Sequence, residues 1–324
     1  MKLPILILNP HPRCNCRCAM CDIWKTTERA EFAVEDLRHQ MESLDNLGVE
    51  WVVLSGGEAL MHSDLFSLCR VLRARNIRIS LLSSGLLLER HAAAIAEWID
   101  DVIVSVDGPP ALHDEIRGVQ SAFALMTRGI AAIRSIKLRF PITARCTVQK
   151  RNCAHLAATA KAAREIGLDS ISFLAADLTS EAFNRAGGWP LDRTASIALR
   201  PGEIPVLEAQ IEMLSRFGGD YVVESAEKLQ RIVAHFRAHL GTEPNVAPRC
   251  NAPWVSAVLE SNGEVRPCFF HKPYGKLEAG QTLADIIEGP EANAFRAQLD
   301  IDTNETCRRC VCSLFIAERE QTAV

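Results

Sequence analysis

The amino-acid sequence predicts an α/β protein, a partial (β/α)6 TIM-like barrel followed by a small C-terminal domain built from a β-hairpin and a helix. Two observations lead to this expectation. In residues 1–180, short aliphatic or β-branched runs alternate with longer amphipathic segments, which is typical of βα units around a parallel sheet. From residue 246 onward, cysteines gather around a hairpin signal. Residues 181–245 are expected to form bridging helices and loops.

Composition limits the class of protein further. The chain has 324 residues, 48% of them hydrophobic, which is enough for one large core and a smaller appended domain. Its formal net charge of −4 argues against a nucleic-acid partner or an anionic membrane surface. The apolar start, residues 3–8, is too short for a signal peptide or a membrane span. We therefore expect a cytoplasmic protein without a membrane span.

Six short runs have the composition of barrel strands, and helical periodicity appears between them. The expected strands are Ile5–Leu8, Trp51–Leu54, Ile77–Leu82, Val102–Val106, Ile142–Val148 and Ser170–Phe173. The expected helices include Val34–Leu47, Asp64–Arg75, Leu156–Ile166, Ile204–Phe217 and Ser225–His239. Because the chemistry of such barrels lies at the carboxyl ends of the strands, the residues after each strand are the candidates for function.

The first expected strand is followed by a loop with four cysteines. Cys14, Cys18 and Cys21 have the spacing Cys-x3-Cys-x2-Cys. A cubane iron–sulfur cluster normally takes four cysteine ligands, so three leave one iron open to a further ligand. Zinc is the alternative, since Cys-x2-Cys is also a zinc knuckle. Cys16 fits no second triad and is interpreted as a bystander thiol.

The next two strands end in small and polar residues. Ser55-Gly56-Gly57-Glu58 follows the second strand, where two glycines allow close backbone approach and a carboxylate can accept hydrogen bonds from an ammonium group. Ser83 opens Ser-Ser-Gly after the third strand. Its hydroxyl can bind a polar ligand, and a helix cap is the alternative.

The fourth strand ends with the most specific run, Ser105-Val-Asp-Gly-Pro, followed by His-Asp and then Arg117-Gly. An arginine suits an anionic ligand because its planar fork pairs a carboxylate in two places and stays charged. A surface salt bridge is the alternative for Arg117.

Taken in order, these motifs resemble those of the radical S-adenosylmethionine superfamily. The glycine motif resembles Gly-Gly-Glu-Pro with Ala59 in place of proline, and Met20 stands where the family usually has an aromatic residue. The resemblance implies a 4Fe–4S cluster on Cys14, Cys18 and Cys21 whose open iron binds S-adenosylmethionine. It also implies reductive cleavage to a 5′-deoxyadenosyl radical, with electrons from a flavodoxin- or ferredoxin-type reductant. The implied S-adenosylmethionine contacts are Ser55, Gly56, Gly57, Glu58, Ser83, Ser105, Arg117 and Leu174, the last where the family packs adenine against the sixth strand.

Asp177 follows the sixth strand and is a candidate acid of the substrate pocket. A helix cap is the alternative for an aspartate in this position. Gly187-Gly188-Trp189-Pro190 then begins the least informative part of the chain and is interpreted as a loop.

The C-terminal segment carries a second group of cysteines. Asn262-Gly263 between two extended runs predicts a hairpin that brings Cys250 close to Cys268. A helical stretch near Leu283–Leu299 then returns the chain to the last three cysteines, Cys307, Cys310 and Cys312. Structural zinc is a serious alternative for four converging thiolates.

This pattern resembles the twitch domain, a shortened relative of the SPASM domain. The resemblance implies one auxiliary 4Fe–4S cluster held by Cys250, Cys268, Cys307 and Cys310, with Cys312 as an alternative to Cys310. His271 is a candidate base because an imidazole titrates near neutral pH, although a surface histidine is the plainer interpretation.

The sequence thus favours a radical S-adenosylmethionine oxidoreductase. We expect hydrogen abstraction from a small polar metabolite, with the auxiliary cluster accepting an electron in a net oxidation. The main alternative is a peptide-modifying enzyme that forms crosslinks or epimers. A non-enzymatic iron–sulfur or zinc sensor is a remote third possibility.

Overall fold

The fold is described from a computed structural model, which describes residues 1–217 and 219–317. One sheet of nine strands organises the molecule, in the order β6-β5-β4-β3-β2-β1-β7-β8-β9. The six strands expected from the sequence are present and parallel, which confirms the partial barrel. Their bounds are β1 Ile5–Asn9, β2 Trp51–Leu54, β3 Arg78–Ser83, β4 Asp101–Ser105, β5 Ile142–Val148 and β6 Ile171–Ala175.

The C-terminal segment continues the same sheet. The hairpin β7 (Ser256–Glu260) and β8 (Glu264–Arg266) forms around Asn262-Gly263 as expected, and a short β9 (Gly275–Lys276) follows. Unexpectedly, β7 also pairs with β1 in parallel, from Ile5 opposite Ser256 to Asn9 opposite Glu260. The first strand of the chain therefore lies between β2 and β7.

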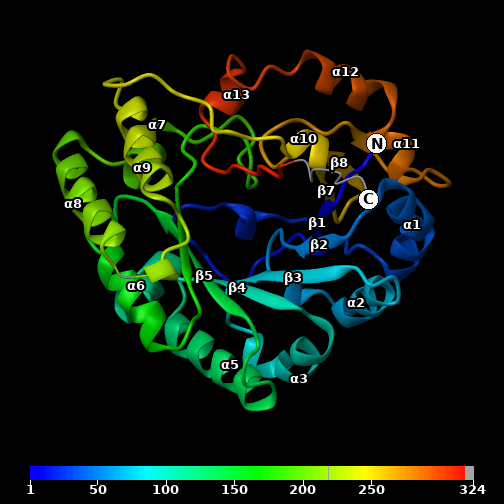
Figure 1. Ribbon diagram of the computed structural model, residues 1–324, viewed down its shortest axis with the longest axis horizontal. Coiled ribbons are helices and arrows are strands. Elements are labelled where there is room, and N and C mark those ends of the chain that lie inside the picture. The colour runs from blue at the N-terminus through cyan, green and yellow to red at the C-terminus, as the bar shows by residue number, and fades with distance from the viewer. Residues whose placement is uncertain (218, 318–324) are drawn as a thin grey trace, which may run out of the picture.

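Helices cover the outside of the curved sheet (Figure 1). Those of the barrel are α1 Val34–Leu47, α2 Leu65–Arg73, α3 Leu88–Trp98, α4 Pro110–Arg117, α5 Ala122–Ile136 and α6 Leu156–Glu165. Those that follow are α7 Leu191–Ile197, α8 Ile204–Ser215, α9 Ala226–His239, α10 Ala252–Val255, α11 Leu283–Ile287, α12 Pro290–Gln298 and α13 Glu305–Arg308. Short 3-10 helices lie at Ile23–Lys25, Ala59–Met61, Pro201–Glu203 and Gly219–Tyr221.

The single helix expected near Leu283–Leu299 is divided into α11 and α12. Gly289 and Pro290 lie at the break. Proline fixes its own φ and lacks a backbone N–H, so it is tolerated in the first turn of a helix but not in the interior. The periodicity of apolar residues continued across this break, which is why the sequence alone suggested one helix.

The core lies between the sheet and its covering helices, with β1 near its centre. Leu6 and Leu8 of β1 are fully buried, as are Leu54 of β2 and Val104 of β4. Alternate residues of β5 are buried, as period-two alternation requires. In the described part of the chain, no helix has the length and apolar character needed to cross a membrane.

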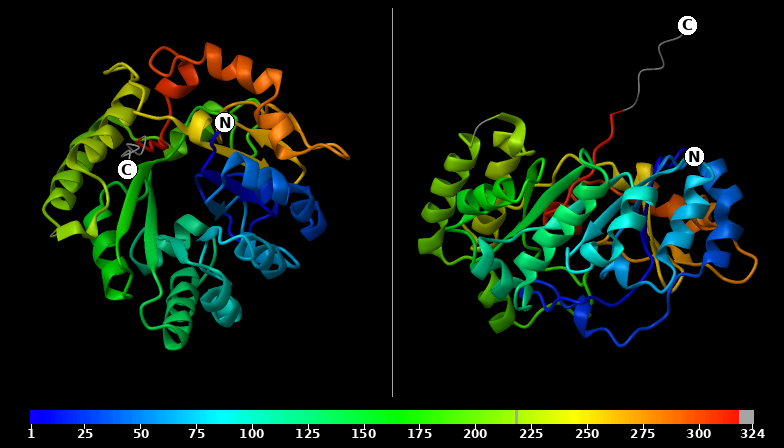
Figure 2. Two further views of the ribbon diagram at one scale, coloured as in Figure 1. Left: turned by 45° about the vertical axis from the view of Figure 1, so that its right-hand side comes forward. Right: turned by 90° about the horizontal axis from the view of Figure 1, so that it is seen from below.

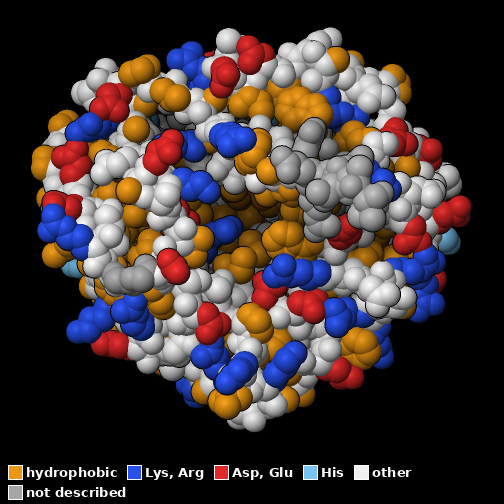
Figure 3. Space-filling view, in the orientation of Figure 1, with side chains coloured by type: hydrophobic (Ala, Val, Ile, Leu, Met, Phe, Trp, Pro, Cys, Tyr) orange, Lys and Arg blue, Asp and Glu red, His pale blue; other side chains and the backbone are white. Residues whose placement is uncertain are grey.

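The two ends of the barrel differ. In the right-hand view of Figure 2, the loop after β1 lies at the lower edge of the barrel and the N terminus at the upper edge. Figure 3 shows a hollow at the centre of the molecule, lined by hydrophobic side chains, with Lys or Arg side chains along one side. The strands therefore place the cysteine loop, residues 13–24, at one rim of the barrel.

Candidate active site

The cysteine loop is fixed to the barrel by main-chain hydrogen bonds. Arg17 N donates to Arg117 O (2.9 Å) and Ala19 N to Ile116 O (2.8 Å), which joins the loop to the end of α4. Glu58 N donates to Arg13 O (2.9 Å) on the other side. A Cβ on Gly57 would lie 2.1 Å from that same carbonyl oxygen, so only glycine allows this approach.

The thiols of this loop have unequal acidity. Hydrogen bonding with Cys16, helped by the positive charge of Arg117, lowers the pKa of Cys18 to about 7. Hydrogen bonding with Cys16 also lowers the pKa of Cys14, whereas burial raises the pKa of Cys21 to about 12. The contacts with its neighbours raise the pKa of Cys16, whose side chain is buried. Cys16 is therefore packed against two of the three predicted ligands, Cys14 and Cys18.

Glu58 is fully buried and is bound by Ser83, the last residue of β3, and by Ser84, which follows it. Its carboxylate accepts hydrogen bonds from Ser84 N (2.7 Å), Ser84 Oγ (2.6 Å) and Ser83 Oγ (3.0 Å). Burial nevertheless raises the pKa of Glu58. The structure thus brings together Glu58 and Ser83, two residues predicted separately to contact the same ligand.

Arg117 ends α4 and is buried beside the cysteine loop. Its Nη2 lies 2.6 Å from Asp107 Oδ2, and its Nη1 donates to Cys18 Sγ (3.5 Å). Although burial opposes its charge, Asp107 and the nearby thiols raise the pKa of Arg117 above its usual value. Asp107 Oδ1 is itself held by Thr147 N (2.8 Å) on β5. Arg117 is therefore a fixed cation next to the thiols.

The other predicted contacts lie on the same strand ends. Ser55 follows β2 and its N–H donates to Leu8 O (2.9 Å). Gly56 has a φ of +94°, and Ser105 and Leu174 are half-buried on β4 and β6. Their roles stay predictions.

The donor set suits an iron–sulfur cluster with a zwitterionic ligand. Three thiols come from one loop, and two polar groups beside them, Arg117 Nε and Asn15 Nδ2, are buried without a hydrogen-bond partner among the described residues. Both are donors, as an incoming carboxylate requires. In residues 1–217 and 219–317, no three His, Cys, Asp or Glu side chains are grouped closely enough to hold a single metal ion.

The C-terminal cysteines converge as the hairpin predicted. Five of them line one apolar cavity of about 80 Å³, namely Cys250, Cys268, Cys307, Cys310 and Cys312. Burial raises the pKa of Cys268 to about 11 and that of Cys307 to about 12. Cys310 Sγ donates to Cys312 O (2.5 Å), so both candidates for the fourth ligand lie at the cavity. Which of the two binds a cluster stays open.

A larger cavity of about 660 Å³ adjoins this cysteine-lined cavity. Phe270, His271 and Cys310 line both of them. His271 Nε2 lies 3.4 Å from Cys307 Sγ, and burial lowers the pKa of His271. Asp177 lines the larger cavity, as expected, but its carboxylate is engaged by Arg185 Nη2 (2.5 Å) and by the Ser180 hydroxyl. These contacts hold the side chain of Asp177 in the wall of the larger cavity.

The sequence analysis missed three residues that form hydrogen bonds with Ala19 and Asp22 of the cysteine loop. Trp189 Nε1 donates to Asp22 Oδ2 (2.7 Å), Asn184 Nδ2 to Asp22 O (3.0 Å) and Arg193 Nη2 to Ala19 O (2.5 Å). All three donors come from residues 181–245, which the sequence analysis interpreted only as bridging helices and loops. A tryptophan between two glycines and a proline was the one available signal, because a large aromatic in a loop is usually packed against something.

Comparisons with known proteins agree with this geometry. Residues 8–173 match the Radical SAM superfamily, and residues 250–311 match the SPASM iron–sulfur cluster-binding domain. The AdoMet-dependent heme synthase of Methanosarcina barkeri is 31% identical over 159 residues, which are 48% of this chain and 45% of that protein. The chain thus matches less than half the length of this relative.

Two further similarities extend over most of the chain. The PqqA peptide cyclase of Ruegeria pomeroyi is 29% identical over 275 residues, 82% of this chain and 67% of that protein. The crystal structure of Streptococcus suis SuiB bound to S-adenosylmethionine superposes with a TM-score of 0.66 over 97% of this chain and 73% of that chain, at 16% identity. At this identity the likeness to SuiB shows a shared fold.

Proposed function

The chain belongs to the radical SAM superfamily and carries a C-terminal SPASM domain, and on that premise we propose that it oxidises an organic substrate bound in the larger cavity. The family and the domain bring a 4Fe–4S cluster, S-adenosylmethionine and auxiliary iron–sulfur to the enzyme. When bound, these groups supply a 5′-deoxyadenosyl radical that takes a hydrogen atom and an acceptor for one electron. The remaining work falls to the residues of the chain.

Four features of the cysteine loop and its neighbours support the binding role. The thiolates of Cys14, Cys18 and Cys21 would hold the first cluster, and the fixed cation Arg117 favours the charged form of Cys18. Glu58, buried at the end of β2, would accept hydrogen bonds from the ammonium group of the ligand. Gly57 lets the main chain approach closely.

His271 is the proposed base at the auxiliary end. It lines both cavities, with Nε2 3.4 Å from Cys307 Sγ, and burial lowers its pKa, so the imidazole is neutral at pH 7, as a base must be. The hydrogen atom would come from a carbon that bears a hydroxyl or an amino group, and the proton taken by His271 would come from that O–H or N–H, with the remaining electron passing to the auxiliary cluster. Cys250, Cys268, Cys307 and either Cys310 or Cys312 would hold the auxiliary cluster next to it.

The observation that carries this proposal is that the larger cavity and the cysteine-lined cavity share a wall, which includes Phe270, His271 and Cys310. A volume of about 660 Å³ is within the range of small-ligand sites, which is roughly 300–1,000 Å³. Its lining combines aromatic side chains, Phe270, Tyr274 and Phe295, with charged ones such as Lys272 and Glu291. Such a lining suits a small polar metabolite, which is our first candidate substrate.

A peptide is the second candidate. It is favoured by the similarity to PqqA peptide cyclase over 82% of the chain. In that case the cavity would admit one or two residues of an extended peptide, and the product would carry a crosslink or an inverted centre.

The proposal is tested by anaerobic reconstitution with iron, sulfide, dithionite and S-adenosylmethionine. Deuterated polar metabolites and deuterated peptides are supplied separately, and deuterium is measured in 5′-deoxyadenosine. We expect transfer from one class and, for an oxidised substrate, a product three mass units lighter than the deuterated substrate, because it has lost one deuterium and one hydrogen. A protein with all of Cys14, Cys18 and Cys21 changed to alanine is the control and should release none.

Metal analysis of the same sample checks the two cysteine sites. About eight irons per chain are expected for two cubane clusters. Four irons with one zinc would contradict the auxiliary redox role, and the absence of 5′-deoxyadenosine under every condition would contradict the proposal as a whole.

A further inference from the structure

The loop that follows β6 connects the cysteine loop with the larger cavity. We call residues 177–189 the bracing loop. It begins at Asp177, at the carboxyl end of β6, and ends at Trp189, just before α7. Its first residues line the larger cavity, among them Thr179, Ser180 and Glu181. Its last residues contact the cysteine loop.

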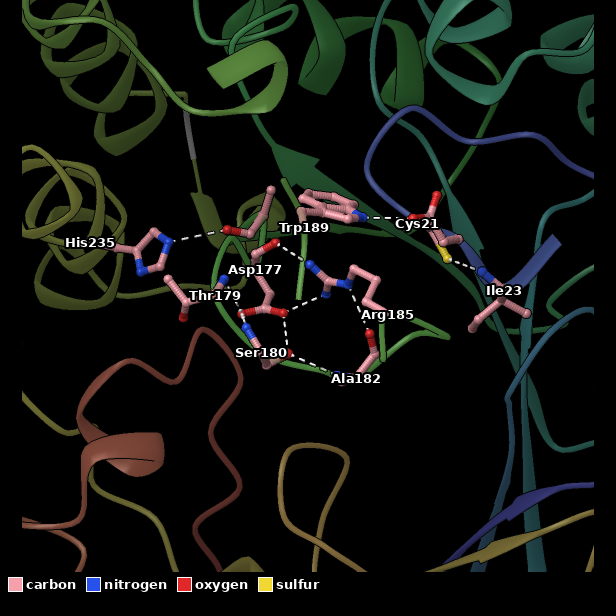
Figure 4. A network of polar contacts seen from close by, with 11 residues as sticks. Cys21, Ile23, Asp177, Thr179, Ser180, Ala182, Arg185, Trp189 and His235 are labelled. Carbon is pink, nitrogen blue, oxygen red and sulfur yellow. Dashed lines mark hydrogen bonds and ion pairs between the residues drawn. The ribbon is translucent and has the colours of Figure 1, made fainter. Parts of the chain in front are cut away.

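Arg185 organises the interior of the bracing loop. Its side chain is fully buried, and its nitrogens donate to Asp177 O (2.9 Å) and Ala182 O (2.8 Å), while Nη2 pairs with Asp177 Oδ2 (2.5 Å). Its guanidinium also lies over Trp189, 4.3 Å from the ring centre, and 5.2 Å from that of Phe183. Figure 4 shows the guanidinium between the Asp177 carboxylate and the indole. One buried cation thus joins both ends of the loop.

The end of the bracing loop near Trp189 forms hydrogen bonds with Asp22, the residue directly after Cys21. Asp22 is buried, and it accepts a hydrogen bond from Trp189 Nε1 on its carboxylate (2.7 Å) and from Asn184 Nδ2 on its carbonyl (3.0 Å). Because Asp22 is bonded covalently to a predicted cluster ligand, the position of Cys21 depends on the indole and therefore on Arg185 beneath it.

The middle of the loop reaches the C-terminal domain. Phe183 stacks on Phe269 (6.3 Å between ring centres) and meets Phe270 edge to face (6.0 Å). Phe183 and Asn184 have φ values of +61° and +63°, a conformation that costs a non-glycine residue free energy. Such a conformation persists only where surrounding contacts determine it, and here both neighbouring sites supply those contacts.

We propose that Arg185 is a positioning residue that sets the place of Cys21 and Asp22 relative to the wall of the substrate cavity. This inference rests on the proposed function in taking the larger cavity as the substrate site. A hydrogen atom is transferred efficiently only from a closely defined position, and a displacement of about 1 Å can cost about a hundredfold in rate. A rigid link between the cysteine loop and the cavity wall supplies that definition.

The test uses the full chain with both clusters reconstituted. Arg185→Met removes the cation but leaves Asp177 buried and unpaired, so the double variant Asp177→Asn, Arg185→Met is made beside it. Trp189→Phe keeps the ring and removes only the hydrogen bond to Asp22. Arg134→Met is the matched control, because Arg134 pairs with Asp169 (2.8 Å) at the other end of β6.

Two quantities are measured that do not depend on turnover. They are the dissociation constant of S-adenosylmethionine and the change it causes in the electron paramagnetic resonance spectrum of the reduced protein. We expect the double variant to bind S-adenosylmethionine about tenfold more weakly and to show a broadened spectrum of the first cluster. Trp189→Phe should show the same change to a smaller extent, and Arg134→Met should match the wild type. The signal of the auxiliary cluster should not move.

A third measurement addresses the cavity wall. The number of S-adenosylmethionine molecules cleaved per substrate oxidised should rise about tenfold in the double variant, because the radical then meets a misplaced substrate. If the double variant and Trp189→Phe both bind S-adenosylmethionine with wild-type affinity and spectrum, the inference is overturned. A wild type that binds S-adenosylmethionine but oxidises no candidate would defeat the proposed function instead, and the binding comparison would still decide the role of Arg185 toward the cysteine loop.

Discussion

At the scale of single residues, Gly57 shows how little room the cysteine loop leaves. Gly57→Ala would place a methyl group against the Arg13 carbonyl, and a main-chain atom cannot move aside without shifting the loop. We expect a loss of about 1–3 kcal/mol of stability and a sharp fall in the iron bound by this loop. Thermal unfolding and iron content of the reconstituted protein measure both effects.

Gly202→Ala provides the matched control. No atom lies within 4 Å of the position that its Cβ would occupy. Gly202→Ala should therefore leave both values unchanged. A Gly57→Ala protein with wild-type iron content would show that the loop tolerates the displacement.

Residue types and spacing were enough to predict the family and its cofactors, but not the contacts between the residues at the strand ends. Glu58 and the serine that ends β3 were each assigned to an absent ligand, and in the structure they bind each other. Asp177 was a candidate acid of the substrate pocket, with a helix cap as the alternative, and nothing in the sequence shows that Arg185, eight residues later, folds back onto it. Pairings of this kind depend on loop conformation, which local periodicity does not encode.

At the scale of elements, α9 is tied to the end of β6 through a histidine. His235 Nε2 lies 3.1 Å from Ala176 O. Burial, which outweighs the nearby charge of Asp177, lowers the pKa of His235 from 6.5 to about 4. The unfolded chain therefore binds a proton below pH 6.5 that the folded chain does not bind until about pH 4, so stability falls as the pH falls through this window.

His235→Gln should remove this dependence. Between pH 7.5 and pH 5 we expect the wild type to lose on the order of 1–2 kcal/mol more than the variant. Urea unfolding of both proteins at the two pH values measures the difference, and the comparison cancels effects common to both. Equal losses would mean that His235 is not the group responsible.

Elements with long regular periodicity were predicted well, and the exceptions have physical causes. Val34–Leu47 and Trp51–Leu54 were predicted with the observed bounds. The bracing loop had no periodicity to interpret, because its residues are fixed by an ion pair, aromatic contacts and left-handed backbone at two non-glycine residues, Phe183 and Asn184. Its function could be recognised only in three dimensions.

At the scale of the whole molecule, the C-terminal segment completes the barrel sheet. Removing residues 250–324 would expose the edge of β1, whose Leu6 and Leu8 lie in the core. An exposed parallel edge with buried apolar neighbours promotes aggregation. We therefore expect the truncated chain to elute as aggregates in size-exclusion chromatography.

A full-length chain separates the strand from the metal site. With Cys250, Cys268, Cys307 and Cys310 changed to serine, β7 remains and the auxiliary cluster is lost. This protein should elute as a single folded species. A truncated chain that behaves in the same way would show that β7 is dispensable.

The parallel pairing of β1 with β7 could not be expected from the sequence. The hairpin signal at Asn262-Gly263 indicated that β7 pairs with β8. The sequence of a strand that has a neighbour at each edge does not indicate which strand that second neighbour is. Sequence patterns identify strands more reliably than they identify the strands with which each one pairs. The expectation of an appended C-terminal domain did not include the pairing that joins β7 to the barrel sheet.

The parallel pairing of β1 with β7 also affects the order in which the sheet forms as the chain is synthesised. The strand made first, residues 5–9, receives its second neighbour only after residues 256–260 have been made. Contacts between segments so distant in the chain form slowly, because a long loop must be closed first. The partners that hold the cysteine loop, Glu58, Ile116 and Arg117, are made well before β7. We therefore expect the edge of β1 that faces β7 to be the last part of the parallel sheet to be covered.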